Sequence, residues 1–259
     1  MTWRRIGFGI LMLMAAFGHV PPGYATDVPE SGEAIPPLSR QQIEQIVRDY
    51  LLREPDILFQ AAKIYEQRQK SRPTADVRQT IVNSRALLAD VRAPSIGSPT
   101  PKVTLVEFFD FRCVYCRRMS PTVEQIVKEN ADVRVVFKDL PILGPVSITG
   151  SHAVLAAKQQ HPDRYYEFHQ ALMRANDLSE AQIFGIAGEL GLDTDQLRRD
   201  MVGPEVKAEV DANFALAKAL SIAGTPAFIL GNTLIPTSMS KPDLVRRIEE
   251  VRKSCDAAC

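Results

Sequence analysis

Residues 103–116 constrain the fold of this 259-residue chain more than any other stretch. Seven mostly apolar residues, Val103–Phe109, predict a buried strand, and the turn 110–112 leads directly to Cys113 and Cys116 at the start of a helix. A helix N-terminus presents unpaired N–H groups and a partial positive charge, so a cysteine there ionises readily to the thiolate that attacks disulfides. The spacing predicts a redox-active dithiol. A static disulfide or half of a zinc site has the same spacing.

The first residues predict export. Arg4 and Arg5 precede an apolar run at residues 6–17 and a small-residue end at Ala25. This order is typical of a secretory signal peptide over residues 1–25, cleaved after Ala25, with an uncleaved anchor as the alternative. The four cysteines of an exported chain can be oxidised. The formal net charge of zero indicates no nucleic-acid partner.

A helical segment is expected before the buried strand. Residues 26–38 are rich in Pro, Gly and Ser, which predicts a flexible leader. Apolar residues at helical spacing then predict three amphipathic helices, at residues 39–54, 56–72 and 74–91. Residues 93–101 contain Pro and Gly and are expected to form a hinge. We interpret residues 39–92 as a self-association segment, with ordinary helices that pack on their own domain as the alternative.

The rest of the chain predicts an α/β fold with a helical insertion. A strand, a helix and a second strand with short links form a βαβ unit, which implies parallel neighbours. A long helical stretch between two β segments indicates an inserted subdomain. The elements expected here are a helix at 117–130, a strand at 133–137, a helical insert at 147–220, a hairpin at 226–235 and a last helix at 241–253.

Together these residues resemble the DsbA family of exported thiol-disulfide oxidoreductases. The run Phe108–Cys116 is similar to the active-site sequence of that family, and Gly224-Thr225-Pro226 is similar to the loop that holds its cis-proline. The resemblance covers about residues 102–253. It implies a thioredoxin fold with an inserted helical subdomain, in two parts at 102–146 and 221–253 around the insert 147–220, followed by a tail at 254–259.

The resemblance implies that Cys113 is the nucleophile and Cys116 the resolving thiol. The chemistry agrees, because the first cysteine lies nearer to solvent at the helix tip. Thr225 and Pro226 are expected to bind the substrate backbone, and their peptide bond is expected to be cis. No cofactor and no metal are expected in this reaction.

Val114 and Tyr115, between the two cysteines, are also expected to contact the substrate. Relatives often have Pro at the first of these positions, and the strongly oxidising members have His at the second. Without an imidazolium nearby, Cys113 loses one source of thiolate stabilisation. We therefore hypothesise a less oxidising protein than the strongest oxidases.

Glu107 is an acid within an otherwise apolar strand. A buried carboxyl has a raised pKa and can exchange protons with a nearby thiol. Family members carry an acid beneath the active site, so the resemblance implies that Glu107 is a proton shuttle to Cys116. A partly exposed edge-strand glutamate is the alternative. Lys138, at the end of the next strand, could offset the charge of Glu107.

Residues 43–51, followed by Glu54-Pro55, resemble the oligomerisation segment of the suppressor-of-copper-sensitivity branch of the family. This implies a periplasmic disulfide isomerase or reductase that acts as a homo-oligomer, with a trimer favoured. A monomeric DsbA-like dithiol oxidase is the alternative. The implied partners are unfolded or misoxidised exported proteins and a membrane redox partner that recycles the dithiol.

Cys255 and Cys259 stand four residues apart at the C-terminus. A peripheral disulfide is the first expectation for this pair, and an accessory redox pair is the second. All four thiolates could also bind copper or zinc, which gives metal handling as a second class of function.

Overall fold

The computed structural model describes residues 38–70 and 74–254. The chain divides into two compact units, residues 1–62 and 63–259, and each is described by itself. The predicted signal peptide, most of the predicted leader, and both Cys255 and Cys259 lie outside the described residues. Within the described residues, we find no helix long and apolar enough to cross a membrane.

The described part of the first unit consists of α1 (Arg40–Arg53) and the start of α2 (Asp56–Lys70). Ser39 caps α1 in a capping box, in which the Ser39 hydroxyl accepts from the Gln42 N–H and the Gln42 side chain accepts from the Ser39 N–H. The helix ends at Arg53, as predicted, because Pro55 disfavours helical geometry in the residue before it.

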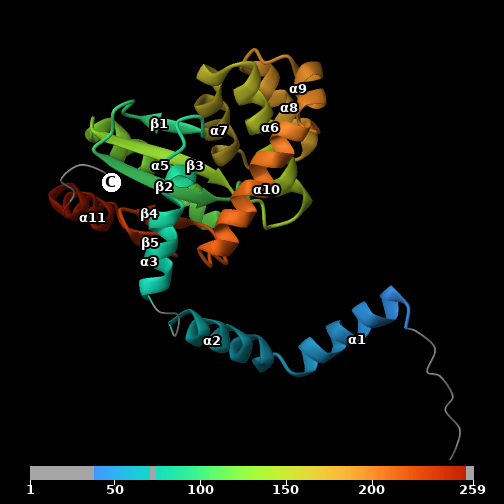
Figure 1. Cartoon of the computed structure of the whole chain (residues 1–259). Coiled ribbons are helices and arrows are strands. Elements are labelled where there is room, and N and C mark those ends of the chain that lie inside the picture. The colour runs from blue at the N-terminus through green and yellow to red at the C-terminus, as the bar shows by residue number, and fades with distance from the viewer. Residues whose placement is uncertain (1–37, 71–73, 255–259) are drawn as a thin grey trace, which may run out of the picture. The chain divides into compact units, whose positions relative to one another are not determined.

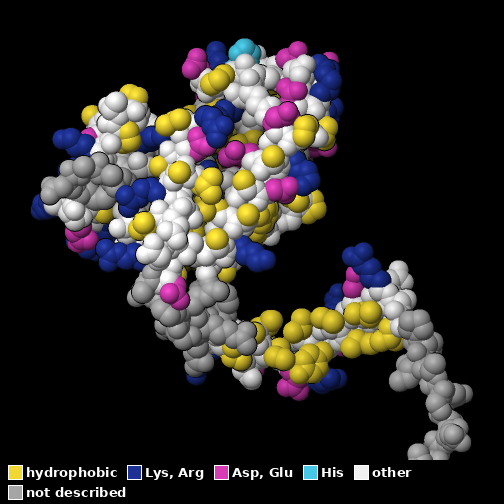
Figure 2. Space-filling model, viewed as in Figure 1, with side chains coloured by type: hydrophobic (Ala, Val, Ile, Leu, Met, Phe, Trp, Pro, Cys, Tyr) yellow, Lys and Arg dark blue, Asp and Glu magenta, His cyan; other side chains and the backbone are white. Residues whose placement is uncertain are grey.

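The apolar face of α1 is exposed in the part of the chain that the structure describes. None of the residues of α1 is buried. Figure 2 shows hydrophobic side chains that run along α1 and the start of α2. The large exposed apolar residues of α1 are Ile43, Ile46, Val47, Tyr50 and Leu52. A face of this kind normally packs on another surface.

The second unit is built on a five-stranded mixed sheet (Figure 1). The central strands β2 and β3 are parallel, and the other neighbours are antiparallel. Both central strands are buried along nearly their whole length because helices cover both faces. The strand order is β1-β3-β2-β4-β5, with β1 at Ser95–Gly97, β2 at Val103–Phe109, β3 at Val133–Asp139, β4 at Ala227–Leu230 and β5 at Thr233–Ile235.

One face of the sheet carries the larger core, in which α5 and α11 pack on β2, β3 and β4 and join the inserted helices. The predicted insert, βαβ unit, hairpin and last helix are all present. The elements are α5 (Val114–Glu129), α6 (Pro145–Gln160), the 3-10 helix η1 (Pro162–Arg164), α7 (Tyr165–Arg174), α8 (Glu180–Glu189), α9 (Thr194–Asp200), α10 (Pro204–Ala219) and α11 (Lys241–Ser254).

The other face of the sheet is covered by α10 together with α3 (Thr74–Asn83) and α4 (Arg85–Leu88). Ile81 and Leu88 are buried there against Val106 and Phe108 of β2. The structure therefore differs from the predicted self-association segment 39–92. Its last third covers an apolar sheet face that would otherwise be exposed. The predicted third helix is also divided, since Ser84 leaves helical geometry.

The predicted hinge, residues 93–101, is partly a strand. Residues 95–97 form β1, which pairs with β3, and the carbonyl of Pro94 accepts from the Phe137 N–H at 2.8 Å. Ala93 and Pro94 are buried. Gly97 has a φ of 96°, and a Cβ there would lie 2.3 Å from the Val133 carbonyl oxygen. This close pairing requires glycine at position 97, so Gly97 belongs to a strand and not to the predicted hinge.

Candidate active site

Cys113 is the N-cap of α5. The strand β2 ends at Phe109, and the cysteine turn, residues 110–113, leads into the helix with the Cys113 N–H donating to the Asp110 carbonyl at 3.0 Å. The Cys113 sulfur accepts from the Cys116 N–H at 3.4 Å. The side chain of Cys113 thus takes the place of the usual capping oxygen, and a charged sulfur satisfies a helix N–H best.

The second part of the site comes from the loop before β4. Antiparallel pairing of β2 with β4 sets Phe108 opposite Ala227, so this loop lies beside the end of β2. The peptide bond Thr225-Pro226 is cis, as expected. The Cys113 thiol donates to the Thr225 carbonyl at 3.1 Å. The structure therefore brings Cys113, Cys116 and the cis-proline loop together.

The two thiols differ in acidity. Hydrogen bonding with the side chain of Cys116, and then with the side chain of Thr225, lowers the pKa of Cys113 to about 6, against the opposing effect of burial. Burial raises the pKa of Cys116 well above its usual range, and its hydrogen bond with Cys113 and the charge of Glu107 add to the rise. Both are free thiols, and Cys116 is completely shielded from solvent. Cys113 can therefore be a thiolate at neutral pH while Cys116 keeps its proton.

Glu107 is buried in β2, on the face of the sheet that α5 covers. Burial raises the pKa of its carboxyl to about 8, and the nearby charge of Cys113 adds to the rise. The alternative of a partly exposed edge-strand glutamate is wrong, because β2 lies between β3 and β4. Glu107 can thus hold or release a proton beside the dithiol near neutral pH.

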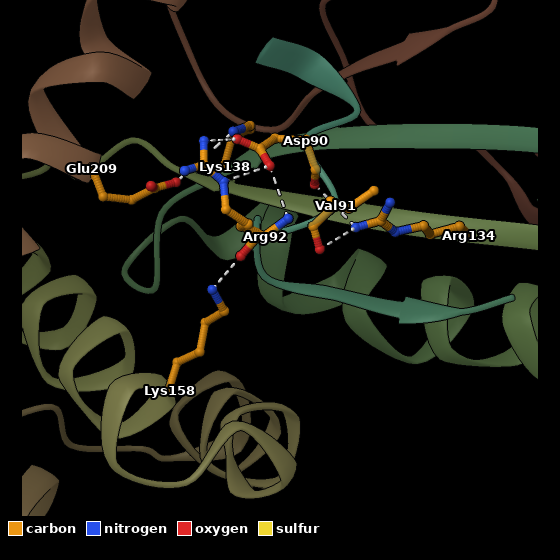
Figure 3. A network of polar contacts seen from close by, with 7 residues as sticks. All are labelled: Asp90, Val91, Arg92, Arg134, Lys138, Lys158 and Glu209. Atoms are coloured by element: carbon orange, nitrogen blue, oxygen red, sulfur yellow. Dashed lines mark hydrogen bonds and ion pairs between the residues drawn. The ribbon is translucent and has the colours of Figure 1, made fainter. Parts of the chain in front are cut away.

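Lys138 does not offset the charge of Glu107, and this part of the sequence-based interpretation is wrong. In the β2–β3 register, Glu107 is opposite Phe137, whereas Lys138 is opposite Phe108 on the other face. The Lys138 ammonium is buried there, 3.8 Å from the Glu209 carboxylate of α10. Figure 3 shows the ion pair between the two side chains. Successive side chains of a strand point to opposite faces of the sheet. A difference of one residue in the β2–β3 register therefore decides whether Lys138 or Phe137 lies beside Glu107.

Val114 and Tyr115 lie in the first turn of α5 with more than half of each side chain exposed. The Arg118 guanidinium stands over the Tyr115 ring, 5.9 Å from its centroid. Two exposed side chains therefore follow the buried Cys113 at the start of α5.

Two polar residues of the site were not assigned a role beyond the turn from sequence. The buried Asp110 carboxylate accepts hydrogen bonds from Arg112, Leu143 and Ser147. Arg117 of α5 donates from Nε to the Met173 carbonyl at 2.9 Å at the end of α7. Of these hydrogen bonds, only the one from the Arg112 N–H to Asp110 is local, and an Asp that accepts from the N–H two residues later is typical of a turn. The other partners are 33 to 56 residues away along the chain, where sequence spacing gives no signal.

Residues 104–249 match the DSBA-like thioredoxin domain. The chain belongs to this family. Residues 40–72 match a second domain, the copper resistance protein ScsC N-terminal domain. The resemblance to the DsbA family and its ScsC-like branch is therefore confirmed, and so is the fold class, an α/β thioredoxin-like domain preceded by a helical segment.

Three relatives illustrate this membership. A thioredoxin-like oxidoreductase from Silicibacter pomeroyi is 41% identical, with a TM-score of 0.62 over 66% of this chain and 98% of that one. A linker-deletion variant of ScsC from Proteus mirabilis is 27% identical, with a TM-score of 0.65 over 84% and 98%. The thiol:disulfide interchange protein DsbA of Bordetella parapertussis is 30% identical over 145 residues, 53% of this chain and 68% of the relative.

The chain spans about a third of the length of the first curated relatives that it matches, Na(+)/H(+) antiporters of two Salinispora species that are 25% identical to it over 88% of this chain. Among the described residues of this DSBA-like chain, no group of three or more His, Cys, Asp or Glu side chains could hold a metal ion. Because Cys255 and Cys259 lie outside those residues, their pairing and the metal-handling alternative stay predictions.

Proposed function

We propose that this chain is an exported thiol-disulfide oxidoreductase that acts on protein disulfides through Cys113 and Cys116. The observation that carries the proposal is the place of Cys113 at the N-terminus of α5 beside the cis-proline loop, where its sulfur accepts from the Cys116 N–H. Hydrogen bonding there lowers the pKa of Cys113 to about 6. With that pKa, about nine tenths of Cys113 is thiolate at pH 7. A structural cysteine buried in apolar surroundings would have a raised pKa instead.

The reaction has two exchange steps. The Cys113 thiolate attacks one sulfur of a substrate disulfide, so a Cys113–substrate disulfide forms and the other substrate sulfur leaves as a thiolate. Cys116 then loses its proton and attacks the Cys113 sulfur, which forms the Cys113–Cys116 disulfide and releases the second substrate thiolate. The substrate is reduced and the dithiol is oxidised.

Isomerisation follows a different route from the same mixed disulfide. The first released thiolate attacks a second disulfide of the substrate and expels a new substrate thiolate, which then attacks the substrate sulfur of the mixed disulfide. This forms a new substrate disulfide and releases the Cys113 thiolate, so neither the substrate nor the dithiol is oxidised or reduced overall.

Glu107 is the proposed proton acceptor for Cys116. The very high pKa of Cys116 means that its thiol must lose a proton within a buried site before the second step. With a pKa of about 8, the Glu107 carboxyl is partly ionised at neutral pH and can take that proton. Glu107 therefore acts in the second exchange step, in which Cys116 releases the substrate, and not in the first step, in which the Cys113 thiolate attacks the substrate disulfide.

Substrate binding is assigned to the cis-proline loop and to the exposed residues of the C-x-x-C. The Thr225 carbonyl already faces the Cys113 sulfur, where the backbone of an extended substrate can pair with it. Val114 and Tyr115 offer exposed apolar and aromatic surface next to that sulfur. Unfolded or misoxidised exported proteins present such extended segments, and we propose them as substrates. A membrane redox partner would return the dithiol to its working state.

We further propose that the protein works as a homo-oligomeric isomerase or reductase in the periplasm. The exposed apolar face of α1 and the match of residues 40–72 to the ScsC N-terminal domain support association through this segment, with a trimer favoured. The signal-peptide pattern of residues 1–25 supports export. A pKa near 6 for Cys113, above the value of about 3.5 for the strongest DsbA oxidant, agrees with a less oxidising protein.

Refolding of a scrambled-disulfide substrate tests this proposal. The unsubstituted protein and a Val47→Glu variant are compared, because a charge in the apolar face of α1 opposes association. Gln41→Glu on the same helix is the matched control. We expect isomerase activity and oligomer mass from the unsubstituted protein and the control, with both lost in Val47→Glu. A monomeric unsubstituted protein that only oxidises a reduced substrate would establish the oxidase alternative.

A further inference from the structure

Asp110 is a fully buried acid at the end of β2, and its carboxylate joins three separate points of the chain. Oδ1 accepts from the Arg112 N–H at 2.7 Å and from the Ser147 hydroxyl at 2.7 Å, and Oδ2 accepts from the Leu143 N–H at 3.0 Å. The backbone of Asp110 contacts both cysteines, since its carbonyl accepts from the Cys113 N–H and it forms a backbone hydrogen bond with the Cys116 sulfur.

Two of the three partners of Asp110 lie outside the cysteine turn, in the next loop and the next helix. Leu143 is part of the β3–α6 loop, residues 140–144, and Ser147 lies in the first turn of α6, where it is completely buried. A second bond joins the same parts, because Arg112 Nη1 donates to the Leu143 carbonyl at 2.8 Å. The cysteine turn is therefore fastened to the start of the helical insert.

Packing next to these bonds leaves little room for the cysteine turn to move. A Cβ placed on Gly150 of α6 would lie 3.1 Å from the Phe111 ring, which is itself fully buried. Close packing on one side and buried hydrogen bonds on the other fix the direction in which the turn delivers Cys113. The hydrogen bond from the Cys116 N–H, which stabilises a charged Cys113 sulfur, depends on this direction.

We propose that Asp110 is a positioning residue for Cys113, and that its carboxylate keeps the sulfur aligned with the start of α5 by tying the cysteine turn to Leu143 and Ser147. The inference rests on the proposed function only in that it concerns the same nucleophile. A carboxylate is needed because two oxygens accept three bonds here. An amide has one accepting oxygen, and its NH₂ would face a hydrogen-bond donor.

The test is the pH dependence of Cys113 alkylation by iodoacetamide in the full-length reduced protein, with Asp110→Asn, Ser147→Ala and the double variant. We expect Asp110→Asn to raise the pKa of Cys113 by about one unit, which lowers the thiolate fraction about tenfold at acidic pH. Ser147→Ala removes one of the three bonds and should shift the pKa in the same direction by less. The double variant should equal Asp110→Asn, because both changes act through one contact.

Asp139→Asn is the matched control, since Asp139 is an equally buried acid at the end of β3 and no hydrogen bond among the described residues joins its carboxyl to the cysteine turn. Its Cys113 titration should equal that of the unsubstituted protein. The proposal is overturned if Asp110→Asn and Ser147→Ala both titrate like the unsubstituted protein. If Asp110→Asn does not fold, Ser147→Ala alone decides. Because alkylation needs no substrate, a lack of disulfide exchange by the unsubstituted protein would refute the proposed function without affecting this test.

Discussion

Replacing Glu107 by Gln should make the protein more stable at neutral pH. The folded carboxyl has a pKa of about 8 against an ordinary value of 4.5, so the folded chain holds this proton more tightly than the unfolded chain does. Stability is then greatest below pH 4.5 and is lost as the pH rises toward 8. Each pH unit is worth about 1.4 kcal/mol, so the cost of Glu107 at pH 7 is about 3 kcal/mol. Gln has nearly the shape of the protonated acid and avoids that cost.

The measurement is guanidinium unfolding of the reduced protein and of Glu107→Gln at several pH values between 4 and 8. The difference in unfolding free energy should be close to zero at pH 4 and should grow to about 3 kcal/mol at pH 7. Other titrating groups are common to both proteins and cancel in the difference. In the proposed function, the variant should also release substrate from the mixed disulfide more slowly.

Asp139→Asn is the control that separates stability from chemistry. Burial raises the pKa of Asp139 to about 8 as well, so its replacement should give a similar dependence of stability on pH. Release of substrate should not change, because Asp139 contacts neither cysteine. A difference between Glu107→Gln and the unsubstituted protein that stays constant from pH 4 to 8 would refute the buried-acid argument.

Three other changes test the site and the fold. Cys116→Ala removes the main hydrogen bond that lowers the pKa of Cys113, so the alkylation midpoint should rise above pH 6; an unchanged midpoint would contradict this cause. Ile81→Ala leaves a cavity against the sheet and should cost about 2–5 kcal/mol in urea unfolding, whereas no cost would place α3 outside the core. Gly97→Ala should lower stability by at least about 1 kcal/mol in thermal unfolding, because φ is positive and the Val133 carbonyl is close; an equally stable variant would contradict the close pairing.

The parts that were predicted correctly from sequence are those with local signals. The strand and helix around Cys113 follow from an apolar run and a turn, and the hairpin follows from Gly231, which has a positive φ of 60°. The cis bond before Pro226 followed from the family resemblance. These features need only neighbouring residues or a short motif.

The parts that were missed depend on partners far along the chain. Ile81 shows helical spacing, but spacing does not say whether the face covers a sheet of the same chain or another molecule. The partner of Lys138 depended on the β2–β3 register, which sets it opposite Phe108. Asp110 and Ser147 are 37 residues apart along the chain, and only the folded position of α6 brings the Ser147 hydroxyl to the Asp110 carboxylate. Such contacts exist only in the assembled fold.

The first helix has a consequence for how the chain folds. A helix of 14 residues is marginal in water, and among the described residues a capping box and surface side-chain pairs stabilise α1. If α1 is stabilised by the proposed association between chains, its helical content should depend on protein concentration, while that of the sheet unit should not. Far-ultraviolet circular dichroism upon dilution would show partial loss of helix without loss of the core. For this segment, the amount of helix would then depend on the concentration of the protein as well as on its sequence.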